Sequence, residues 1–202
     1  MTDLLAEPSG GTAITDEERR GLRLPVLTRD ELNRAEAENI SNAMLWVFNP
    51  RRRLRPESVS KETWLLALHR RMYDQVWNWA GKYRTTDRNL GLPYWQVRVE
   101  MRNLQADAQA WLADTGPNRL NDDECAIRFG YRLVVIHPFP NGNGRWSRLA
   151  SDALVAALGG RRFTWGGGSL TATGQLRRTY ITALQTADRT GDLGPLLSFA
   201  RA

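Results

Sequence analysis

Cysteine and histidine are almost absent from this chain of 202 residues. Cys125 is the only cysteine, and His69 and His137 are the only histidines. A single cysteine excludes an internal disulfide, and its setting in ECAIRFGYRL favours a small, inert, buried side chain over an activated thiolate. Two histidines and one cysteine also cannot assemble a structural zinc site or a three-histidine catalytic one. Any metal bound by this chain is therefore expected to have oxygen ligands.

Long apolar runs are missing as well. No window of the sequence approaches the roughly twenty consecutive apolar residues that a membrane span needs. The N-terminal stretch MTDLLAEPSGG lacks the basic-then-apolar order of a secretion signal. We therefore expect a soluble protein of the cytoplasm that does not contact a membrane.

The composition is sufficient for one compact domain. With 202 residues and 42% hydrophobic content, the chain can bury a substantial core. Its net charge of +6 can attract nucleic acid, and the densest basic cluster is RRRLR at residues 51–55. No recognition-helix or aromatic stacking pattern accompanies that cluster. It is typical of a solvated loop between helices, so nucleic acid is not an expected partner.

Helical spacing of apolar residues covers most of the chain. Residues 1–21 are instead rich in Gly, Thr, Ser and acidic residues, which indicates an extended N-terminal arm before one domain over 22–202. Thr28 followed by Glu31 is a capping-box pattern and predicts a helix over about 28–48. Further helices are expected over 60–81, 101–116, 121–136, 144–158 and, as one or two helices, 174–200, with Ser60 and Asn121 as caps.

The stretch NLGLPYWQVRVEM, residues 89–101, has a different character. It combines Gly, Pro and aromatic residues with local alternation at Val97 and Val99. This pattern predicts a short β-hairpin, or flap. The expected fold class is therefore all-α with one small β-hairpin.

The stretch HPFPNGNGRWSR, residues 137–148, joins two of the expected helices by a sharp turn. Its prolines forbid helix, while Gly142 and Gly144 allow backbone angles that are closed to other residues. A new helix begins at about residue 144, so the amides of residues 142–145 point together at the positive end of its dipole. Such an arrangement of amides can hold an anion.

Charged and titratable side chains flank this turn. Arg145 and Arg148 are three residues apart, so both can lie on one face of the helix and add charge suited to phosphate oxygens. His137 ends the preceding helix, where its imidazole can accept a proton from a hydroxyl. A simpler interpretation is an interhelical turn in which His137 caps a helix and the arginines pair with surface acids. Because a turn needs only one or two of these features, we favour the catalytic interpretation.

These residues resemble the signature of the Fic family, H-P-F-x-[D/E/N]-G-N-G-R-x-x-R. VWNWAGKYRTTDRNLG resembles the segment before the family's flap, and RRTYITALQTADRTGDLGPLL resembles its closing helices. From about residue 28 to residue 199 the chain resembles the bacterial subgroup called mobile mystery protein B, which implies one Fic domain. The signature positions are filled by His137, Pro138, Phe139, Asn141, Gly142, Asn143, Gly144, Arg145 and Arg148.

The resemblance implies protein adenylyltransfer, in which AMP from ATP is placed on a Ser, Thr or Tyr hydroxyl of a target protein and pyrophosphate is released. By matched position, His137 is implied to be the general base. Phe139 is implied to point into the core and fix the loop. The anion hole and triphosphate site are implied to consist of Asn143 with the amides of Gly142 and Gly144, together with Arg145 and Arg148.

Asn141 departs from the pattern of many adenylylating members, which carry Asp or Glu there to coordinate Mg²⁺ between the α- and β-phosphates. An asparagine oxygen is still a ligand for Mg²⁺ but brings no charge. Family members with Asn here include a phosphotransferase branch that resembles H-x-F-x-N-A-N-K-R. Phosphate transfer, or transfer of another nucleotide, is therefore the alternative reaction, and a non-catalytic nucleotide- or nucleic-acid-binding helical domain is a third hypothesis.

The resemblance also implies a partner site and a regulatory residue. A protein substrate would add as an extended segment to the edge of the flap at 89–101, and the chain would also modify itself. The family's inhibitory helix carries [S/T]-x-x-x-E-[G/N], which Glu38 matches in part because Arg34 occupies the Ser/Thr position. Glu36 is an equal candidate, and we expect one of them to pair with Arg148 unless both are solvated charges. His69 is assigned no role, and Trp64, Trp77, Trp79 and Trp111 are expected in the core.

Overall fold

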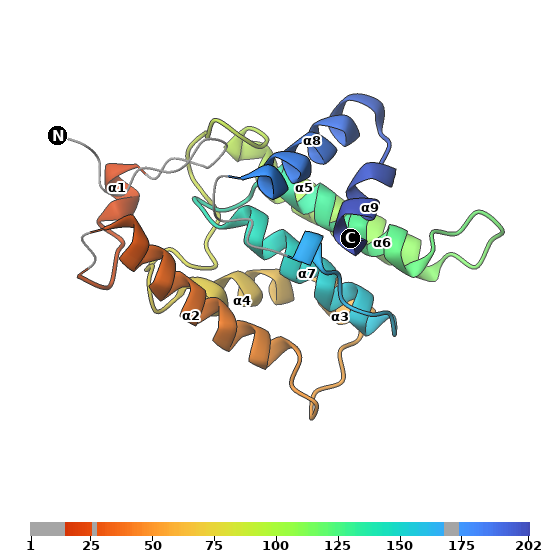
Figure 1. Cartoon of the computed structure of the whole chain (residues 1–202), viewed down its shortest axis with the longest axis horizontal. Coiled ribbons are helices and arrows are strands. Elements are labelled where there is room, and N and C mark those ends of the chain that lie inside the picture. The colour runs from red at the N-terminus through yellow and green to blue at the C-terminus, as the bar shows by residue number, and fades with distance from the viewer. Residues whose placement is uncertain (1–14, 26–27, 168–173) are drawn as a thin grey trace.

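The computed structural model describes residues 15–25, 28–167 and 174–202, and the chain is mostly helical there (Figure 1). Over these ranges no strand forms, and the β pairing is limited to an isolated antiparallel bridge between Leu22 and Trp77. The all-α prediction is confirmed. The helices are α1 (Asp16–Arg19), α2 (Arg29–Val47), α3 (Pro56–Val59), α4 (Glu62–Tyr73), α5 (Val97–Ala113), α6 (Asp122–Ile136), α7 (Asn143–Ala157), α8 (Gln175–Thr190) and α9 (Gly194–Arg201), with 3₁₀ turns η1 (Tyr94–Gln96) and η2 (Trp165–Gly167).

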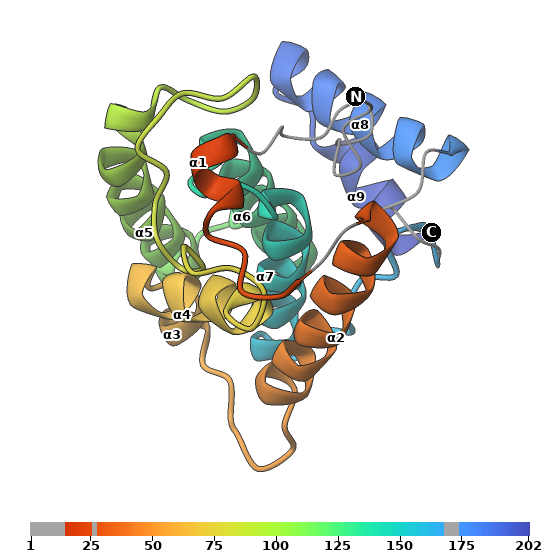
Figure 2. The ribbon, with the colours of Figure 1, turned by 90° about the vertical axis from the view of Figure 1, so that its left-hand side faces the viewer.

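Helices α6 and α7 pack against each other at the centre of the molecule. α5 covers α6 on one side, and α2 lies with α4 on the other, where α4 contacts α7 (Figure 2). α8 and α9 pack together, and α9 contacts α6. Phe129, Leu133 and Trp146 of the central pair are each 0% exposed. The loop that joins α6 to α7, residues 137–142, therefore begins and ends in the core, and together with the first turns of α7 it forms the motif of residues 137–148.

Local capping patterns set several helix starts as predicted. The Thr28 hydroxyl accepts a bond from the Glu31 amide at 3.3 Å, and the Glu31 carboxylate accepts one from the Thr28 amide at 3.0 Å. Asn121 caps α6 in the same reciprocal way. Ser60 was expected to cap a helix, and this prediction is wrong. A short helix, α3, spans Pro56–Val59 with Ser60 as its C-cap, so Lys61 occupies the N-cap of α4.

The helix predicted over 60–81 is shorter than its apolar spacing indicated. α4 ends at Tyr73, and the chain then turns through residues 74–82. Contacts from elsewhere stabilise these turns: the Gln75 amide donates to the side chain of Asn39 at 3.1 Å, and the Asn78 amide donates to the Gly21 carbonyl at 2.8 Å. Tertiary partners therefore end α4 before its sequence pattern does.

The predicted hairpin over 89–101 does not form. Residues 94–96 make the turn η1, and Val97 begins helix α5. The residues of α5 that are buried are Val97, Met101, Leu104 and Ala108, at helical spacing, whereas Val99 is 47% exposed. A strand would place Val97 and Val99 on one face, whereas the helix places them on opposite faces, and a pattern of two residues is too short to exclude the helix.

The N-terminal arm is described from residue 15, and it is not extended throughout. Thr15 and Glu18 make a capping box for the single turn α1. The arm then lies against the turns after α4, because the indole of Trp79 donates to the Glu18 carbonyl at 3.2 Å. Residues 1–14 of the predicted arm lie outside the described ranges. Whether residues 22–202 form one domain stays a prediction.

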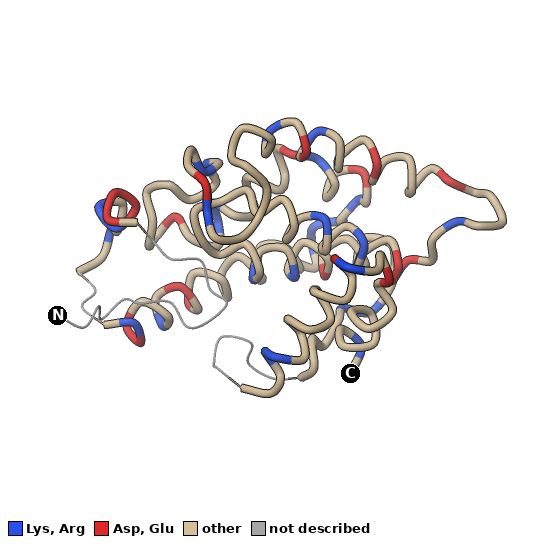
Figure 3. Tube along the Cα trace, turned by 90° about the horizontal axis from the view of Figure 1, so that it is seen from above, with Lys and Arg blue, Asp and Glu red and all other residues tan. Residues whose placement is uncertain are grey.

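Several exclusions drawn from composition can be checked against the described residues. No helix there is both long enough and apolar enough to cross a membrane. Cys125 is 3% exposed, and burial raises its pKa to about 11, which favours the thiol. The basic residues 51–53 are exposed in the loop between α2 and α3 as expected, and Lys and Arg are interspersed with Asp and Glu along the trace (Figure 3).

Candidate active site

The loop at the start of the motif has an unusual backbone at both ends. His137 ends α6 in the left-handed region, with φ 53° and ψ 57°, which few residues other than glycine adopt. Gly142 is the N-cap of α7 with φ 81°. A Cβ at Gly142 would lie 2.5 Å from the ring of Tyr73, so the close approach also requires glycine. The turn predicted from the prolines and glycines therefore forms.

His137 is buried and is held in one tautomer. Its side chain is 6% exposed, and Nδ1 lies 3.2 Å from the carbonyl oxygen of Val134. A carbonyl only accepts, so Nδ1 carries the proton and Nε2 is the basic nitrogen. Burial is the main cause that lowers the pKa of His137 to about 4, and the charges of Arg84 and Arg88 contribute to the same shift. The imidazole is therefore neutral at neutral pH, as a general base must be.

Asn143 and Phe139 hold the loop together from within. The side-chain oxygen of Asn143 accepts from the Phe139 amide at 2.9 Å, and its NH₂ group donates to the Phe139 carbonyl at 2.9 Å. The Phe139 ring is 0% exposed and lies edge-on to Trp146 at 4.8 Å. Because the side chain of Asn143 is used in bonds to Phe139 within the loop, only the backbone amide of Asn143 could contribute to the expected anion hole. That amide belongs to the first turn of α7, where amides have no acceptor within the helix.

Asn141, the expected metal ligand, lies inside the loop. It is 7% exposed, and its side-chain oxygen accepts a bond from the amide of Gly142. Among the described residues no group of three His, Cys, Asp or Glu side chains is placed to hold a metal. The side chain of Asn141 therefore offers a neutral oxygen here.

Arg145 is bound to a buried carboxylate from α2. Its guanidinium donates to Glu36 Oε2 at 2.6 Å and lies 5.3 Å from the centre of the Tyr73 ring. Glu36 is 2% exposed and also accepts a bond of 2.8 Å from the indole of Trp77. Glu36 therefore pairs with Arg145, whereas the sequence had predicted a pair with Arg148.

The expected pair between a glutamate of α2 and Arg148 does not form. The buried face of α2 contains Leu32, Glu36 and Asn39 at helical spacing, while Glu38 lies on the exposed face. The rotation of the helix therefore selects Glu36, and the position of Glu36 along α2 brings it to Arg145. Partial matching to a short motif could not distinguish these glutamates because the burial of α2 is a tertiary property.

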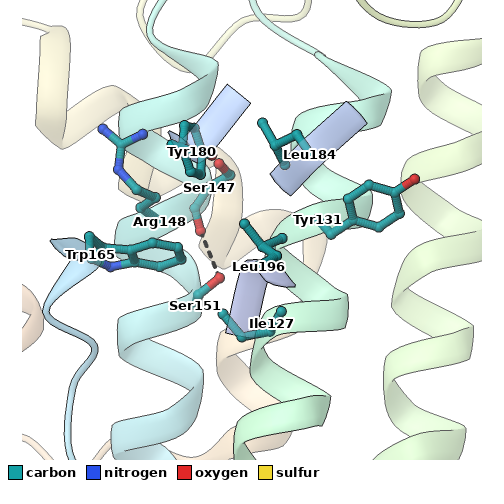
Figure 4. Close-up of a pocket in the computed structure, with 10 residues that line it drawn as sticks. Ile127, Tyr131, Ser147, Arg148, Ser151, Trp165, Tyr180, Leu184 and Leu196 are labelled. Atoms are coloured by element: carbon teal, nitrogen blue, oxygen red, sulfur yellow. Dashed lines mark hydrogen bonds between the residues drawn. The ribbon is translucent and has the colours of Figure 1, made fainter. Parts of the chain in front are cut away.

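Arg148 lies beside the start of α7 and next to a pocket. A Cβ on Gly144 would be 3.6 Å from Nη1 of Arg148, so the guanidinium is close to the first helical turn. It also lies 5.2 Å from the centre of the Tyr180 ring. Figure 4 shows Arg148, Tyr180 and Trp165 around the pocket, whose other walls come from α6, α7, α8 and α9. Arg148 is therefore placed to meet an anion at the N-terminus of α7.

Two residues that contact the loop were missed or set aside at the level of sequence. Arg84 donates through Nε to the carbonyl of His137 at 2.7 Å, and its side chain is 0% exposed. His69 is also 0% exposed, and its ring lies 3.6 Å from that of Phe139. The signal for His69 was present, because it shares a helical face with buried Leu65 and Met72. No local pattern marks Arg84.

The segment that replaces the predicted hairpin covers His137. Arg84 donates to the carbonyls of Thr86, at 3.0 Å, and Leu92, which fixes the two ends of the loop at 85–93. Gly91 has φ 93°, and a Cβ there would lie 2.3 Å from Cβ of His137. The covering loop thus packs directly on the candidate base, which accounts for the burial of the imidazole.

Comparison with known proteins matches the central part of the chain to one family. Residues 59–155 match the Fic/DOC family. The protein adenylyltransferase Fic of Nematostella vectensis is 30% identical over 96 residues, which span 47% of this chain and 22% of that protein. The protein adenylyltransferase fic-1 of Caenorhabditis briggsae is 36% identical over 99 residues, which span 47% of this chain and 19% of that protein. The chain thus spans about a fifth of these curated relatives.

The fold agrees with this match. The BepC protein of Bartonella tribocorum, solved with bound AMPPNP, aligns with a TM-score of 0.65 at 17% identity, over 96% of this chain and 93% of that one. At this identity the likeness concerns the fold. The relation to the mobile mystery protein B subgroup stays a prediction. Residues 59–155, which include α6, the loop at 137–142 and most of α7, are a domain of the Fic/DOC family.

Proposed function

We propose that this chain is a protein adenylyltransferase that moves AMP from ATP to a Ser, Thr or Tyr hydroxyl of a target protein. The observation that carries the proposal is a single loop in a Fic/DOC domain that joins a buried neutral histidine to the glycine-rich start of a helix. The curated relatives named above are protein adenylyltransferases. A cytoplasmic location, where ATP is plentiful, stays a prediction.

His137 acts as the general base in this reaction. Nε2 takes the proton of the target hydroxyl as its oxygen attacks the α-phosphorus, and the bond from that phosphorus to the bridging oxygen of the β-phosphate breaks. Pyrophosphate leaves and AMP remains on the target oxygen. The Nδ1–H bond to the Val134 carbonyl supports this assignment, because it leaves Nε2 as the proton acceptor. No covalent enzyme intermediate is needed, since the work is positioning and charge neutralisation.

The first turn of α7 and the arginines provide the phosphate site. The amides of Gly142, Asn143 and Gly144 lie at the positive end of the α7 dipole, and Arg148 adds a cation beside them. Arg145 contributes once Glu36 has released it. Asn141 Oδ1 would hold Mg²⁺, which supplies charge neutralisation between phosphates, after leaving the Gly142 amide that it now binds.

Glu36 is the proposed inhibitory residue. Its carboxylate occupies one of the two motif arginines, so a triphosphate and Glu36 compete for the same guanidinium. Glu38 is exposed and has no comparable position. The alternative is that the pair only stabilises the packing of α2, and variants of both glutamates distinguish the two possibilities.

The target protein docks beside the covering loop, where the flap had been expected. Leu90, Tyr94, Trp95 and Val99 are between 42% and 62% exposed, an apolar surface on the segment that covers His137. Side-chain packing on this surface takes the place of strand addition to a hairpin. Self-modification is expected at hydroxyls that reach the same place.

Separate incubations with α-labelled and γ-labelled ATP and Mg²⁺ test the reaction. Adenylyl transfer puts the α-label on protein and leaves the γ-label in pyrophosphate. The γ-label on protein would replace this proposal with phosphotransfer, the alternative that Asn141 brings. Neither label on protein, together with measurable nucleotide binding, would favour a non-catalytic binding domain.

A further inference from the structure

The backbone carbonyls at the two ends of the catalytic loop are bonded by side chains from outside the motif. The carbonyl of His137 accepts from Arg84 at 2.7 Å, and the carbonyl of Asn141 lies 3.1 Å from Nε2 of His69. Arg84 is 53 positions away from His137 in the sequence, and His69 is 72 positions away from Asn141. Both side chains are 0% exposed.

Within the described residues, Arg84 donates its side-chain hydrogen bonds to backbone carbonyls. Besides the carbonyl of His137, it reaches those of Thr86 and Leu92, and its backbone amide donates to Pro138 at 2.9 Å. The nearest carboxylate is Asp87, 3.8 Å away and 58% exposed at its side chain. Burial lowers the pKa of Arg84. The guanidinium of Arg84 is buried and gains little from the exposed carboxylate of Asp87, so its charge is balanced mainly by the carbonyl oxygens around it. Arg84 therefore stabilises the backbone geometry that brings those carbonyls together.

The ring of His69 has a defined tautomer. Nδ1 accepts a bond of 3.0 Å from the amide of Gly81, so Nε2 carries the proton and donates to the carbonyl of Asn141. Burial lowers the pKa of His69 to about 3, so the ring is neutral and keeps both bonds at neutral pH. The ring also stacks on Phe139, inside the loop, at 3.6 Å.

We propose that Arg84 and His69 are positioning residues with separate tasks. Arg84 places the base end of the loop, because it fixes the carbonyl of the left-handed residue His137 and the loop that covers it. His69 places the phosphate end, because it fixes Asn141 directly before the amides of α7. The kinetic effects expected of the two residues rest on the proposed function. Their structural effect, which is to orient the imidazole of His137 and the amides of α7, follows from backbone geometry alone.

The two tasks have different kinetic signatures. Misplacing the base end leaves nucleotide binding intact and slows the chemical step, so changes at Arg84 lower kcat by up to about a hundredfold with little change in the KM for ATP. Misplacing the phosphate end weakens contacts to the nucleotide, so changes at His69 raise the KM for ATP by about tenfold. Loss of fold stability alone would lower the active fraction in both series without this separation.

The Arg84 series compares Arg84→Lys with Arg84→Met. Lysine keeps the charge and one donor but not the fork, whereas methionine removes both. We expect kcat to fall in both variants, with partial rescue in Arg84→Lys, and KM for ATP to stay within about twofold. Arg53→Lys, at an exposed arginine, is the matched control. A rise in KM that equals the fall in kcat would overturn the assignment of Arg84 to the base end.

The His69 series compares His69→Gln with His69→Asn. The amide of glutamine reaches the position of Nε2 and keeps the donor to Asn141, while that of asparagine reaches only the position of Nδ1. We expect His69→Gln to retain most ATP affinity and His69→Asn to lose it. Equal effects of the two variants, at equal melting temperatures, would show that the Asn141 bond does not matter.

Two readouts do not depend on AMP transfer. Calorimetric titration with AMPPNP gives the Kd of the nucleotide, which His69→Asn should raise and Arg84→Lys should not. Amide hydrogen exchange of residues 142–145 should speed up in His69→Asn and stay unchanged in Arg84→Lys. If the chain transfers no AMP but these two results hold, the proposed function fails and the assignment of His69 to the phosphate end stands. Unchanged exchange and Kd in His69→Asn would overturn that assignment.

Discussion

The two ends of the catalytic loop lie in opposite electrostatic surroundings. At the base end, burial lowers the pKa of His137 and keeps the imidazole neutral, and the nearby charges of Arg84 and Arg88 act in the same direction. At the phosphate end, Arg145 is bound to the buried carboxylate of Glu36. The first end is ready to accept a proton, whereas the second is partly occupied by an internal anion. Under the proposed function, this difference makes nucleotide binding, rather than the protonation state of the base, the step that Glu36 would inhibit.

The largest effect is expected from removing the base. Asparagine tolerates the left-handed backbone of residue 137, so His137→Asn should keep the fold while AMP transfer falls by about a thousandfold. Transfer of α-label to protein measures the loss, and the melting temperature controls for folding. Activity within tenfold of the unmodified chain would remove His137 from the proposed role.

The next largest effect is expected from removing Arg148, the motif arginine that is not paired with Glu36. Arg148→Ala removes charge-assisted bonds to phosphate, so the Kd for AMPPNP should rise by about ten- to a hundredfold. Its melting temperature should change little, because Arg148 is only partly buried. The matched variant Arg145→Ala should instead lower the melting temperature, since it leaves the carboxylate of Glu36 buried without its ion pair. If the two variants behave alike, the electrostatic difference between the arginines is not real.

A smaller effect, a gain, is expected when the internal anion is removed. Glu36→Gln keeps an oxygen for the indole of Trp77 but loses the charge that competes for Arg145, so nucleotide affinity and self-modification should rise by several-fold, on the order of 1 kcal/mol. Glu38→Gln, on the exposed face of the same helix, is the control. AMPPNP titration and mass spectrometry after incubation with ATP measure both outcomes. No gain in Glu36→Gln, or in Glu36→Gly, would leave the pair with a structural role only.

The smallest effect is expected in the pH dependence of kcat/KM, whose decline in acid should be shifted to lower pH. Protonation of His137 stops its action as a base, and burial lowers its pKa from 6.5 to about 4. The value of kcat/KM should therefore stay level as the pH falls from 8 through 6.5 and decline only near pH 4. Melting temperatures at each pH separate this decline from acid unfolding. A decline centred at pH 6.5 would mean that the imidazole is solvated during turnover and that the covering loop opens.

Sequence predicted the elements whose causes are local. The capping boxes at Thr28 and Asn121, and the left-handed residue Gly142 at the start of α7, depend on contacts within about four residues, and all of them form as expected. The placement of His137 at the end of α6 follows from the same local turn. The hairpin prediction failed because it relied on the alternation of only two valines, while the helix is stabilised by burial of Val97 and Met101 against the rest of the chain.

The sequence by itself thus determined a helical domain and a loop that gathers a histidine, amides and arginines between two helices. Tertiary structure decided which partner each of these groups has: Glu36 joins Arg145 across 109 positions, Arg84 joins His137 across 53, and His69 joins Asn141 across 72. Backbone turns follow from the conformational limits of a few adjacent residues, so they can be inferred from a short pattern. Burial, tautomer and pKa depend on which distant segments exclude water from a side chain, and that is fixed only when the helices pack.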